Sequence, residues 1–425
     1  MSWPYPDGVD RTMSSDKQAE KRGRRGKFLA GISTNVLVLG VVSFLTDTSS
    51  EMLYPILPMF LVSIGATGAI IGLIEGASET TASLLKVYSG WTSDKRRRRK
   101  PFVLGGYGLS SLTKPFFMIA TAPWHVLGIR VTERVGKGIR SAPRDALIAD
   151  SVDAGVRGKA FGLHKTFDSL GAVAGPLIAL AVIVLTAASL DALDDATYRT
   201  IFLAATIPAF AAVAVIVLFL REKEGGGGKV KGRFLVEARR LERPFWLLMV
   251  VVLAFYIGEV SYAFFILRGQ EVGLSVVTVL LLYTMFNLVF ALTAMPAGVL
   301  SDRIGRKPVI LLSFAVFALA CGVMGAAGSV LPVVAGFALF GLYKGGSEGV
   351  LKAYVVDFIP KDLRGTALGV FHTAVGLVML PGGIIAGLLW DAVGPWATFS
   401  FGGVMALVAA GLLMVLGGER ARPTA

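Results

Sequence analysis

The chain has 425 residues, of which 54% are hydrophobic and only 17% are charged. Its mean hydropathy of +0.68 exceeds what the core of a water-soluble protein could hide. The net charge of +13 is carried by cations in alternate loops between apolar runs, so no nucleic-acid partner is expected. Cys321 is the only cysteine, which excludes a disulfide framework and a cysteine metal cluster. The composition predicts a protein embedded in the lipid bilayer.

Residues 1–33 form a polar, basic segment ahead of the first apolar run. Its cations cluster just before that run and are Lys21, Arg22, Arg24, Arg25 and Lys27. The apolar run is too long for a cleavable signal peptide and lacks a small-residue cleavage site after a short core. We therefore expect a cytoplasmic tail that helps to orient the first helix.

Twelve apolar segments follow, each long enough to cross about 30 Å of hydrocarbon, which takes roughly 20 helical residues. Only helices and closed barrels satisfy the backbone in lipid, and runs of this length are helices. The expected fold class is therefore an all-α membrane protein with twelve transmembrane helices. The expected spans are 34–63, 67–92, 101–121, 124–146, 158–187, 198–221, 244–268, 274–301, 308–328, 330–356, 363–391 and 394–417.

The loops on the two sides of these spans differ in charge. Eight Lys or Arg residues lie in the link from Arg221 to Arg243, and six lie in residues 95–100. The loop 188–198, on the other side, instead carries three aspartates. Because cytoplasmic loops are enriched in Lys and Arg, both termini are predicted to be cytoplasmic.

Four consecutive glycines at 225–228, flanked by cations, mark residues 222–243 as a flexible basic linker with a short surface helix. The linker divides an N-terminal six-helix half, 34–221, from a C-terminal half, 244–417. Residues 418–425 are expected to form a second cytoplasmic tail.

A polar loop occurs once in each half. The second copy reads Gly-Val-Leu-Ser-Asp-Arg-Ile-Gly-Arg-Lys-Pro at 298–308, and the first reads Gly-Trp-Thr-Ser-Asp-Lys-Arg-Arg-Arg-Arg-Lys-Pro at 90–101. The two aspartates are 208 residues apart, and neighbouring segments keep an offset of 207 or 208. Pairs at these offsets include Glu51 and Glu259, Tyr54 and Tyr262, Lys137 and Lys344, and Asp150 and Asp357. This indicates two homologous halves related by a parallel duplication.

The pattern Gly-x-x-x-Asp-Arg-x-Gly-Arg-Lys at 298–307 resembles the cytoplasmic signature loop of the major facilitator superfamily of transporters. The resemblance covers residues 34–417 and implies alternating access, with both loops acting as gates. The gating residues that it implies are Gly90, Asp94, Lys95, Gly298, Asp302, Arg303, Arg306 and Lys307. The first copy has Arg97 or Arg98 where the family has glycine, so its turn is expected to differ.

Ionisable side chains at membrane depth are costly unless paired or hydrated, so each one is a candidate functional residue. Asp47 and Glu51 lie one turn apart on one helix face, and the resemblance places this helix opposite the helix of Arg134. Arg134 is therefore expected to oppose these two carboxylates. Proton coupling is assigned to Asp47, Glu51, Glu79 and Arg134.

Other side chains at this depth are assigned to substrate binding: Glu51, Tyr54, Glu75, Lys137, Glu259, Tyr262, Lys344 and Glu348. Glu133 with Lys137, and Lys165 with Asp168, have the spacing of local ion pairs and are expected to be structural. The three histidines, at 125, 164 and 372, show no carboxylate at ligand spacing. No metal site and no cofactor are expected.

Residues 171–176 resemble the motif of drug and proton antiporters in this superfamily, and residues 134–138 resemble its helix 4 motif with Lys137 in place of glutamine. The resemblance predicts proton-coupled export of a drug or metabolite by a monomer in the plasma membrane. Its expected partners are a small-molecule substrate, protons and the lipid bilayer.

Three alternatives stay open. The first is proton-coupled uptake of an organic anion held by Lys86, Arg134, Lys137 and Lys344, the second is export of a divalent metal, and the third is a non-transporting sensor or scaffold. The sequence contains no phosphate loop, nucleophile elbow or Cys-His set, so no enzyme is expected.

Overall fold

The computed structural model describes residues 31–96, 98–187, 189, 193–222, 238, 240–357, 359 and 363–416. The expected basic tail, most of the linker and the C-terminal tail lie outside these ranges. Within them, all regular elements are helices, which confirms the all-α fold class.

The N-terminal half contains six membrane-length units. They are α2 (Thr34–Leu53) with α3 (Leu57–Ser63), α4 (Gly68–Arg96), α5 (Lys100–Thr113) with η1 (Lys114–Ile119), α6 (Pro123–Asp150), α7 (Arg157–Thr186) and α8 (Asp195–Phe219). The short element η2 (Ala154–Val156) connects α6 to α7.

The C-terminal half repeats this arrangement. Its six units are α10 (Arg243–Ile257) with α11 (Tyr262–Glu271), α12 (Val276–Ile304), α13 (Arg306–Gly325), α14 (Val330–Asp357), α15 (Arg364–Ala392) and α16 (Pro395–Leu416). The number of units confirms the twelve expected helices.

Three spans that the apolar pattern predicts as single helices are interrupted. In the first span α2 ends at Leu53, and Pro58 stands in the first turn of α3, where its missing N–H costs no helical bond. The third span continues as the 3-10 helix η1. The seventh span breaks before α11, whose N-cap Ser261 accepts a bond from the backbone N–H of Ala263 at 3.3 Å. Glu259 therefore lies between two helices rather than within one.

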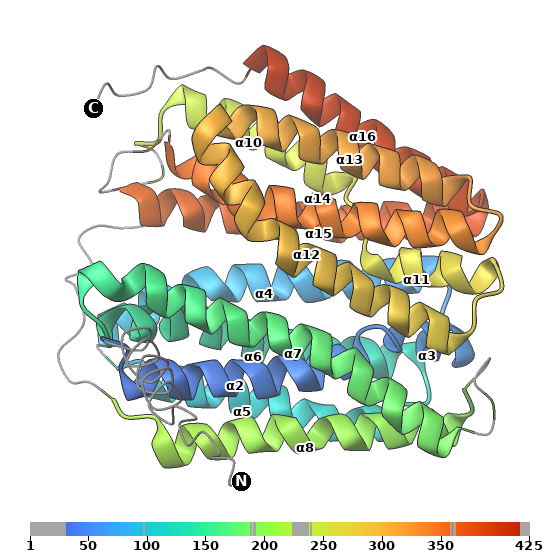
Figure 1. Ribbon diagram of the computed structural model, residues 1–425, viewed down its shortest axis with the longest axis horizontal. Coiled ribbons are helices and arrows are strands. Elements are labelled where there is room, and N and C mark those ends of the chain that lie inside the picture. Colours follow the sequence, from blue (N-terminus) through green and yellow to red (C-terminus); the bar gives the residue numbers. More distant parts are fainter. Residues whose placement is uncertain are drawn as a thin grey trace, which may run out of the picture.

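Nine of the units in the described part of the chain are long and apolar enough to cross a membrane on length and composition alone. The remaining units are α4, α5 with η1, and α6. α4 and α6 carry many of the charged side chains that line the centre of the molecule. Figure 1 shows α4, α5 and α6 running alongside the other helices of their half.

The two halves form two layers, with α2 to α8 in one and α10 to α16 in the other (Figure 1). Within the halves, α2 packs on α7, α4 on α6, and α14 on both α12 and α13. Between the halves, α4 packs on α15, α7 on α12, and α3 on α11.

One end of the molecule, at the left of Figure 1, carries the start of α2, the end of α8 and the start of α10. We call it the basic end because residues 95–96, 98–100, 221–222 and 303–307 lie there. Asn35 donates to the carbonyl of Arg221 at 2.9 Å, and Glu222 accepts from the backbone N–H of Arg99 at 2.6 Å. These bonds tie neighbouring helix ends together.

An ion pair at the basic end occurs once in each half. Arg99 pairs with Asp150, and Arg306 pairs with Asp357 at 3.0 Å. Each residue of the second pair follows its counterpart by 207 positions, the offset that the sequence predicts for the duplication. The repeat is therefore present in the contacts as well as in the sequence.

The opposite end of the molecule, which we call the sealed end, is closed where α4 meets α15. A Cβ atom on Gly72 would lie 2.0 Å from the carbonyl oxygen of Gly383, so the two backbones approach too closely for any larger residue. Asp391 accepts bonds from the backbone N–H groups of Gly68 and Ala69 at 2.7 and 2.8 Å. These bonds satisfy free donors at the start of α4 and fasten it to the other half.

Candidate functional site

A cavity of about 390 Å³ lies between the two halves. It runs from Gly72 and Gly383 near the sealed end to Lys86 and Lys352 nearer the basic end. Its charged lining side chains are Glu75, Glu79, Lys86, Lys137, Glu259, Lys344, Glu348 and Lys352. Six of the eight predicted substrate residues line it, whereas Glu51 and Tyr54 do not.

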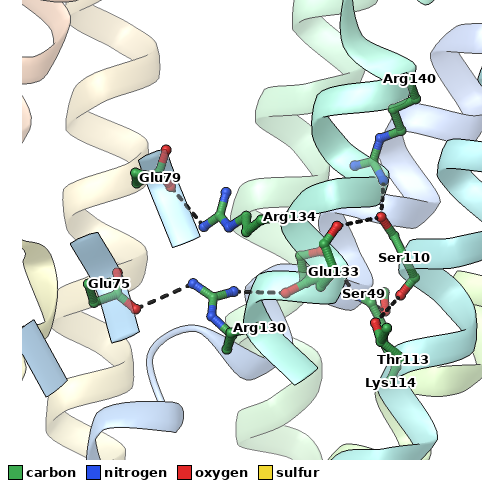
Figure 2. A network of polar contacts seen from close by, with 11 residues as sticks. Ser49, Glu75, Glu79, Ser110, Thr113, Lys114, Arg130, Glu133, Arg134 and Arg140 are labelled. Atoms are coloured by element: carbon green, nitrogen blue, oxygen red, sulfur yellow. Dashed lines mark hydrogen bonds and ion pairs between the residues drawn. The ribbon is translucent and has the colours of Figure 1, made fainter. Parts of the chain in front are cut away.

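The wall formed by α4 and α6 is built on Arg130, whose side chain is fully buried. Its guanidinium lies 2.9 Å from Glu133 and 3.3 Å from Glu75 (Figure 2). A planar guanidinium can hold two carboxylates at once because its donors form a rigid fork. Arg130 thereby connects α6 to α4 at the inner wall of the cavity.

Arg134 lies one turn further along α6 and forms a second pair with α4. Its guanidinium points toward Glu79 (Figure 2) and lies 2.9 Å from the carboxylate. The sequence predicts Arg134 as the opposing charge of Asp47 and Glu51, but the structure pairs it with Glu79. The physical reason is that α6 packs mainly on α4 rather than on α2.

Two tyrosines related by the duplication meet between the halves. The ring of Tyr54 lies 6.4 Å from the ring of Tyr262. The guanidinium groups of Arg130 and Arg134 lie 4.6 and 5.3 Å from the Tyr54 ring, within the range of cation–π attraction. The predicted substrate residue Tyr54 thus packs against the two arginines and does not line the cavity, whereas Tyr262 does.

Glu51 on α2 forms hydrogen bonds across the interface between the halves. Its carboxylate accepts from the Tyr283 hydroxyl at 2.8 Å and from the Asn287 amide at 3.5 Å, both on α12. Asn287 also donates to the carbonyl of Ala172 on α7 at 3.2 Å. The predicted proton-coupling residue Glu51 therefore joins α2 of the N-terminal half to α12 of the C-terminal half. A movement of one half relative to the other would change this contact.

Asp47 lies one turn before Glu51 and faces α7. A Cβ atom on Gly171 would come within 3.0 Å of the Asp47 Cβ, so the two helices are in close contact there. Asp47 forms no hydrogen bond or ion pair with the other described residues. It is a half-buried carboxylate without a direct partner, close to the partnered Glu51.

The C-terminal half contributes two ion pairs to the cavity. Lys344 bonds to Glu259, which also accepts from the Tyr343 hydroxyl at 2.6 Å. Glu348 pairs with Lys352 at 3.1 Å, one turn apart on α14. Glu259 can receive these bonds because the break between α10 and α11 places it beside α14.

The local pairs expected from sequence spacing form only in part. Lys165 lies 4.0 Å from Asp168, as expected. The expected pair of Glu133 with Lys137 is wrong, because Glu133 turns toward Arg130 and Lys137 lines the cavity. The expectation that no histidine has a carboxylate nearby is wrong for His164. Its Nδ1 lies 3.6 Å from a carboxylate oxygen of Asp168.

The described residues contain no group of three or more His, Cys, Asp or Glu side chains that could hold a metal ion.

Comparison with known proteins identifies the family. The sequence profile described as Major Facilitator Superfamily matches residues 39–277 and 257–425. The chain belongs to the major facilitator superfamily. It is therefore a multi-pass membrane transporter with a small-molecule substrate, and not an enzyme.

Several known proteins are similar to this chain along most of their length. An uncharacterized MFS-type transporter of Methanocaldococcus jannaschii is 36% identical over 391 residues, 91% of this chain and 95% of the relative. An uncharacterized protein of Mycobacterium tuberculosis is 28% identical over 363 residues, 84% of this chain and 86% of the relative. A POT family transporter solved in complex with 5-aminolevulinic acid superimposes with a TM-score of 0.75 and 14% identity. The match covers 90% of this chain and 96% of that chain. The last likeness shows the fold alone.

The predicted gating loops lie at the basic end of this superfamily member. Gly305 has a φ of +97°, a conformation that favours glycine, and it joins α12 to α13. Lys307 donates to the carbonyl of Met414 at 3.3 Å. Asp302 and Arg303 are exposed on the last turn of α12, and a Cβ atom on Gly298 would meet nothing within 4 Å.

The first gating loop is less completely described. Gly90 packs α4 on α6, because an added Cβ would lie 3.1 Å from the Cβ of Ala142. The Lys95 ammonium lies 5.2 Å from the Trp91 ring. The side chain of Asp94 lies outside the described part of the structure.

Replacing Asp302 with alanine is expected to slow transport while leaving substrate binding intact. In this state Asp302 is exposed and forms no ion pair with the described residues, so its loss destabilises only a state in which the loops close. A shift of 1 or 2 kcal/mol corresponds to a transport rate about five to thirty times lower. Transport and ligand binding should be measured in parallel, with Asp94→Ala as the equivalent change and Asp195→Ala as an exposed control. An Asp302→Ala protein that transports at the wild-type rate would remove this residue from the gate.

The sequence pattern assigns no role to several polar residues in and around the site. Lys114 is fully buried and donates to the hydroxyls of Ser49 and Ser50 at 2.6 and 3.0 Å. Lys114 and Asn287 are polar residues inside apolar spans. The principle that polar and ionisable side chains at membrane depth are candidate functional residues therefore applies to them as well. Tyr283 gives no such signal, because tyrosine is common in membrane helices.

Proposed function

We propose that this transporter exports a small organic molecule, a drug or metabolite, in exchange for protons, with Glu51 as its principal proton-binding residue. The distribution of Lys and Arg supports a topology with the basic end in the cytoplasm. In that topology the sealed end faces the outside of the cell, and the cavity is reached from the cytoplasm. The plasma membrane is the corresponding location.

The observation that carries the proton-coupling proposal is the bond from Tyr283 to Glu51 at 2.8 Å. It joins a membrane-embedded carboxylate of one half to a helix of the other. A protonated carboxyl group presents a different set of donors and acceptors to Tyr283 and Asn287 than a carboxylate does. Protonation of Glu51 therefore changes the free energy of a contact that differs between alternating-access states, which is what coupling requires.

Exchange rather than cotransport is supported by the resemblance of residues 171–176 to the antiporter motif, and the packing of this segment connects it to the carboxylates of α2. A Cβ atom on Gly175 would lie 2.6 Å from the carbonyl of Thr48 and 2.7 Å from the Cβ of Glu51. The small residues at 171 and 175 thus bring α7 against the turn of α2 that carries Asp47 and Glu51. Movement of α7 would change the surroundings of both carboxylates.

A second candidate function, proton-coupled uptake of an organic anion, is favoured by Lys137. Lys137 lines the cavity and lies within electrostatic range of Asp47. An anion bound at Lys137 would draw this cation away from the neighbouring carboxylate, and a proton on that carboxylate would restore the local charge balance. Anion and proton would then bind together and move in the same direction.

The test of the proposed function starts from purified protein and a panel of candidate substrates. A true substrate raises the melting temperature by mass action, and each stabilising compound is then followed in proteoliposomes with and without a pH gradient. Gradient-driven accumulation supports proton coupling, and equal equilibration under both conditions contradicts it. Stabilisation by compounds that are never transported would favour a sensor or scaffold.

A further inference from the structure

The charged side chains around the cavity are not evenly paired. Its four carboxylates all have a cation within 4.0 Å, and the pairs are Glu75 with Arg130, Glu79 with Arg134, Glu259 with Lys344, and Glu348 with Lys352. Two lining cations, Lys86 and Lys137, form no ion pair or side-chain hydrogen bond with the described residues. The cavity lining therefore includes two lysines whose ammonium groups have no direct partner among the described residues.

These two cations belong to one wall. Lys86 lies on α4 and Lys137 on α6, and the two helices are in contact beside them, where the Ser89 hydroxyl donates to the carbonyl of Gly138 at 2.9 Å. Both side chains are half-buried, so their ammonium groups are partly removed from water. A cation in that position interacts more strongly with an anion than it would in bulk solvent.

Besides its two ion pairs, the C-terminal half contributes an apolar part of the lining. Its lining side chains include Tyr256, Phe340, Phe371, Val375 and Met379. Tyr256 and Phe371 pack edge to face with ring centroids 6.5 Å apart. Aromatic and thioether side chains of this kind suit a planar or apolar ligand body.

We propose that the substrate is an amphipathic organic anion, whose carboxylate or similar group binds Lys137 and Lys86 and whose apolar body lies on the wall of Tyr256, Phe371 and Met379. This inference rests on the proposed function only in taking the cavity to be the transport site, since the two lysines would hold an anion whether it moves with the proton or against it. A cationic substrate would meet two lysines that lack an ion-pair partner, and the four carboxylates of the cavity are already paired. A neutral substrate would leave both lysines unpaired at a half-buried site.

The test uses four probes of matched shape on the full chain. They are 3-phenylpropionate, its amide, 3-phenylpropylamine, and propionate, which has the charge without the ring. Each is titrated to its solubility limit while the melting temperature of the purified protein is recorded, since binding to the folded state raises it. We expect the largest rise with 3-phenylpropionate, a smaller one with propionate, and none with the amine.

The variants Lys137→Gln and Lys86→Gln locate the binding groups. Loss of one charge-assisted bond should weaken 3-phenylpropionate binding about tenfold to a hundredfold. Lys137→Arg should keep the preference for the anion, and Lys165→Gln, which removes an exposed lysine outside the cavity, should bind as wild type. Because two separate lysines are tested, misfolding of one variant still leaves a decisive measurement.

Three results would overturn the inference: the amine or amide stabilises as well as the acid, the acid binds equally in both Gln variants, or none of the four probes binds. The first and third outcomes leave the proposed proton coupling intact, because coupling is measured on whichever compound is transported. A protein that binds the acid through these lysines yet moves no proton would instead contradict the proposed function alone.

Discussion

Replacing Arg130 with alanine is expected to destabilise the protein by about 3–5 kcal/mol, the effect of leaving buried charges without their partner. Arg130 is fully buried and bonds to both Glu75 and Glu133. Its removal leaves two buried carboxylates without their shared cation. The melting temperature of the purified variant should fall far below that of wild type.

Two comparisons separate this charge effect from lost packing. Arg157 is exposed and bonds only to the carbonyl of Ala149 at 3.2 Å among the described residues, so Arg157→Ala should change stability by less than about 0.5 kcal/mol. A triple variant with Arg130→Met, Glu75→Gln and Glu133→Gln removes the charges together and should recover most of the loss. If Arg130→Ala melts at the wild-type temperature, these three residues do not form a stabilising network.

Replacing Glu51 with glutamine is expected to abolish accumulation driven by a pH gradient while sparing exchange of substrate across the membrane. The glutamine carbonyl can still accept from the Tyr283 hydroxyl, so the contact between the halves persists. The side chain can no longer bind or release a proton, so substrate movement loses its link to the gradient. Accumulation and exchange are compared in proteoliposomes prepared from each variant.

Asp47→Asn belongs to the same experiment, because Asp47 shares a helix face with Glu51 and two neighbouring carboxylates titrate as a pair. Glu271→Gln is the matched control, since Glu271 is exposed and pairs with Arg268 at 2.9 Å outside the cavity. Should both Glu51→Gln and Asp47→Asn keep gradient-driven accumulation, the proton site lies elsewhere. Glu75, Glu79 and Glu259 would then be tested in turn.

The fold could be predicted from the sequence because lipid leaves few choices. Twelve apolar runs in a medium that demands complete backbone hydrogen bonding must be helices. The duplication was visible as an offset in charged and glycine residues, and the pairs Arg99–Asp150 and Arg306–Asp357 confirm it in space. Hydropathy carries no information on the helix breaks, so the apolar pattern places Glu259 within a helix rather than between α10 and α11.

The charged residues of the site could be predicted, but their partners could not. Spacing along one helix predicts that Glu133 pairs with Lys137. In the structure Glu133 instead pairs with Arg130, one turn earlier on the same helix. The partner of Arg134 depends on which helix α6 packs against, and that choice is made by side-chain packing between helices. Contacts across the halves, such as Tyr283 with Glu51, join helices far apart in the sequence, so spacing along one helix gives no signal for them.

The most direct test of proton-coupled exchange is to measure proton movement while a substrate gradient is applied. Proteoliposomes carry a pH-sensitive dye inside and no initial pH gradient, and a transported substrate is added outside. Our account predicts that substrate entry drives protons outward, so that the interior becomes alkaline, and that Glu51→Gln abolishes this signal. Acidification of the interior would instead show cotransport, and substrate entry without any change of internal pH in wild type would contradict proton coupling altogether.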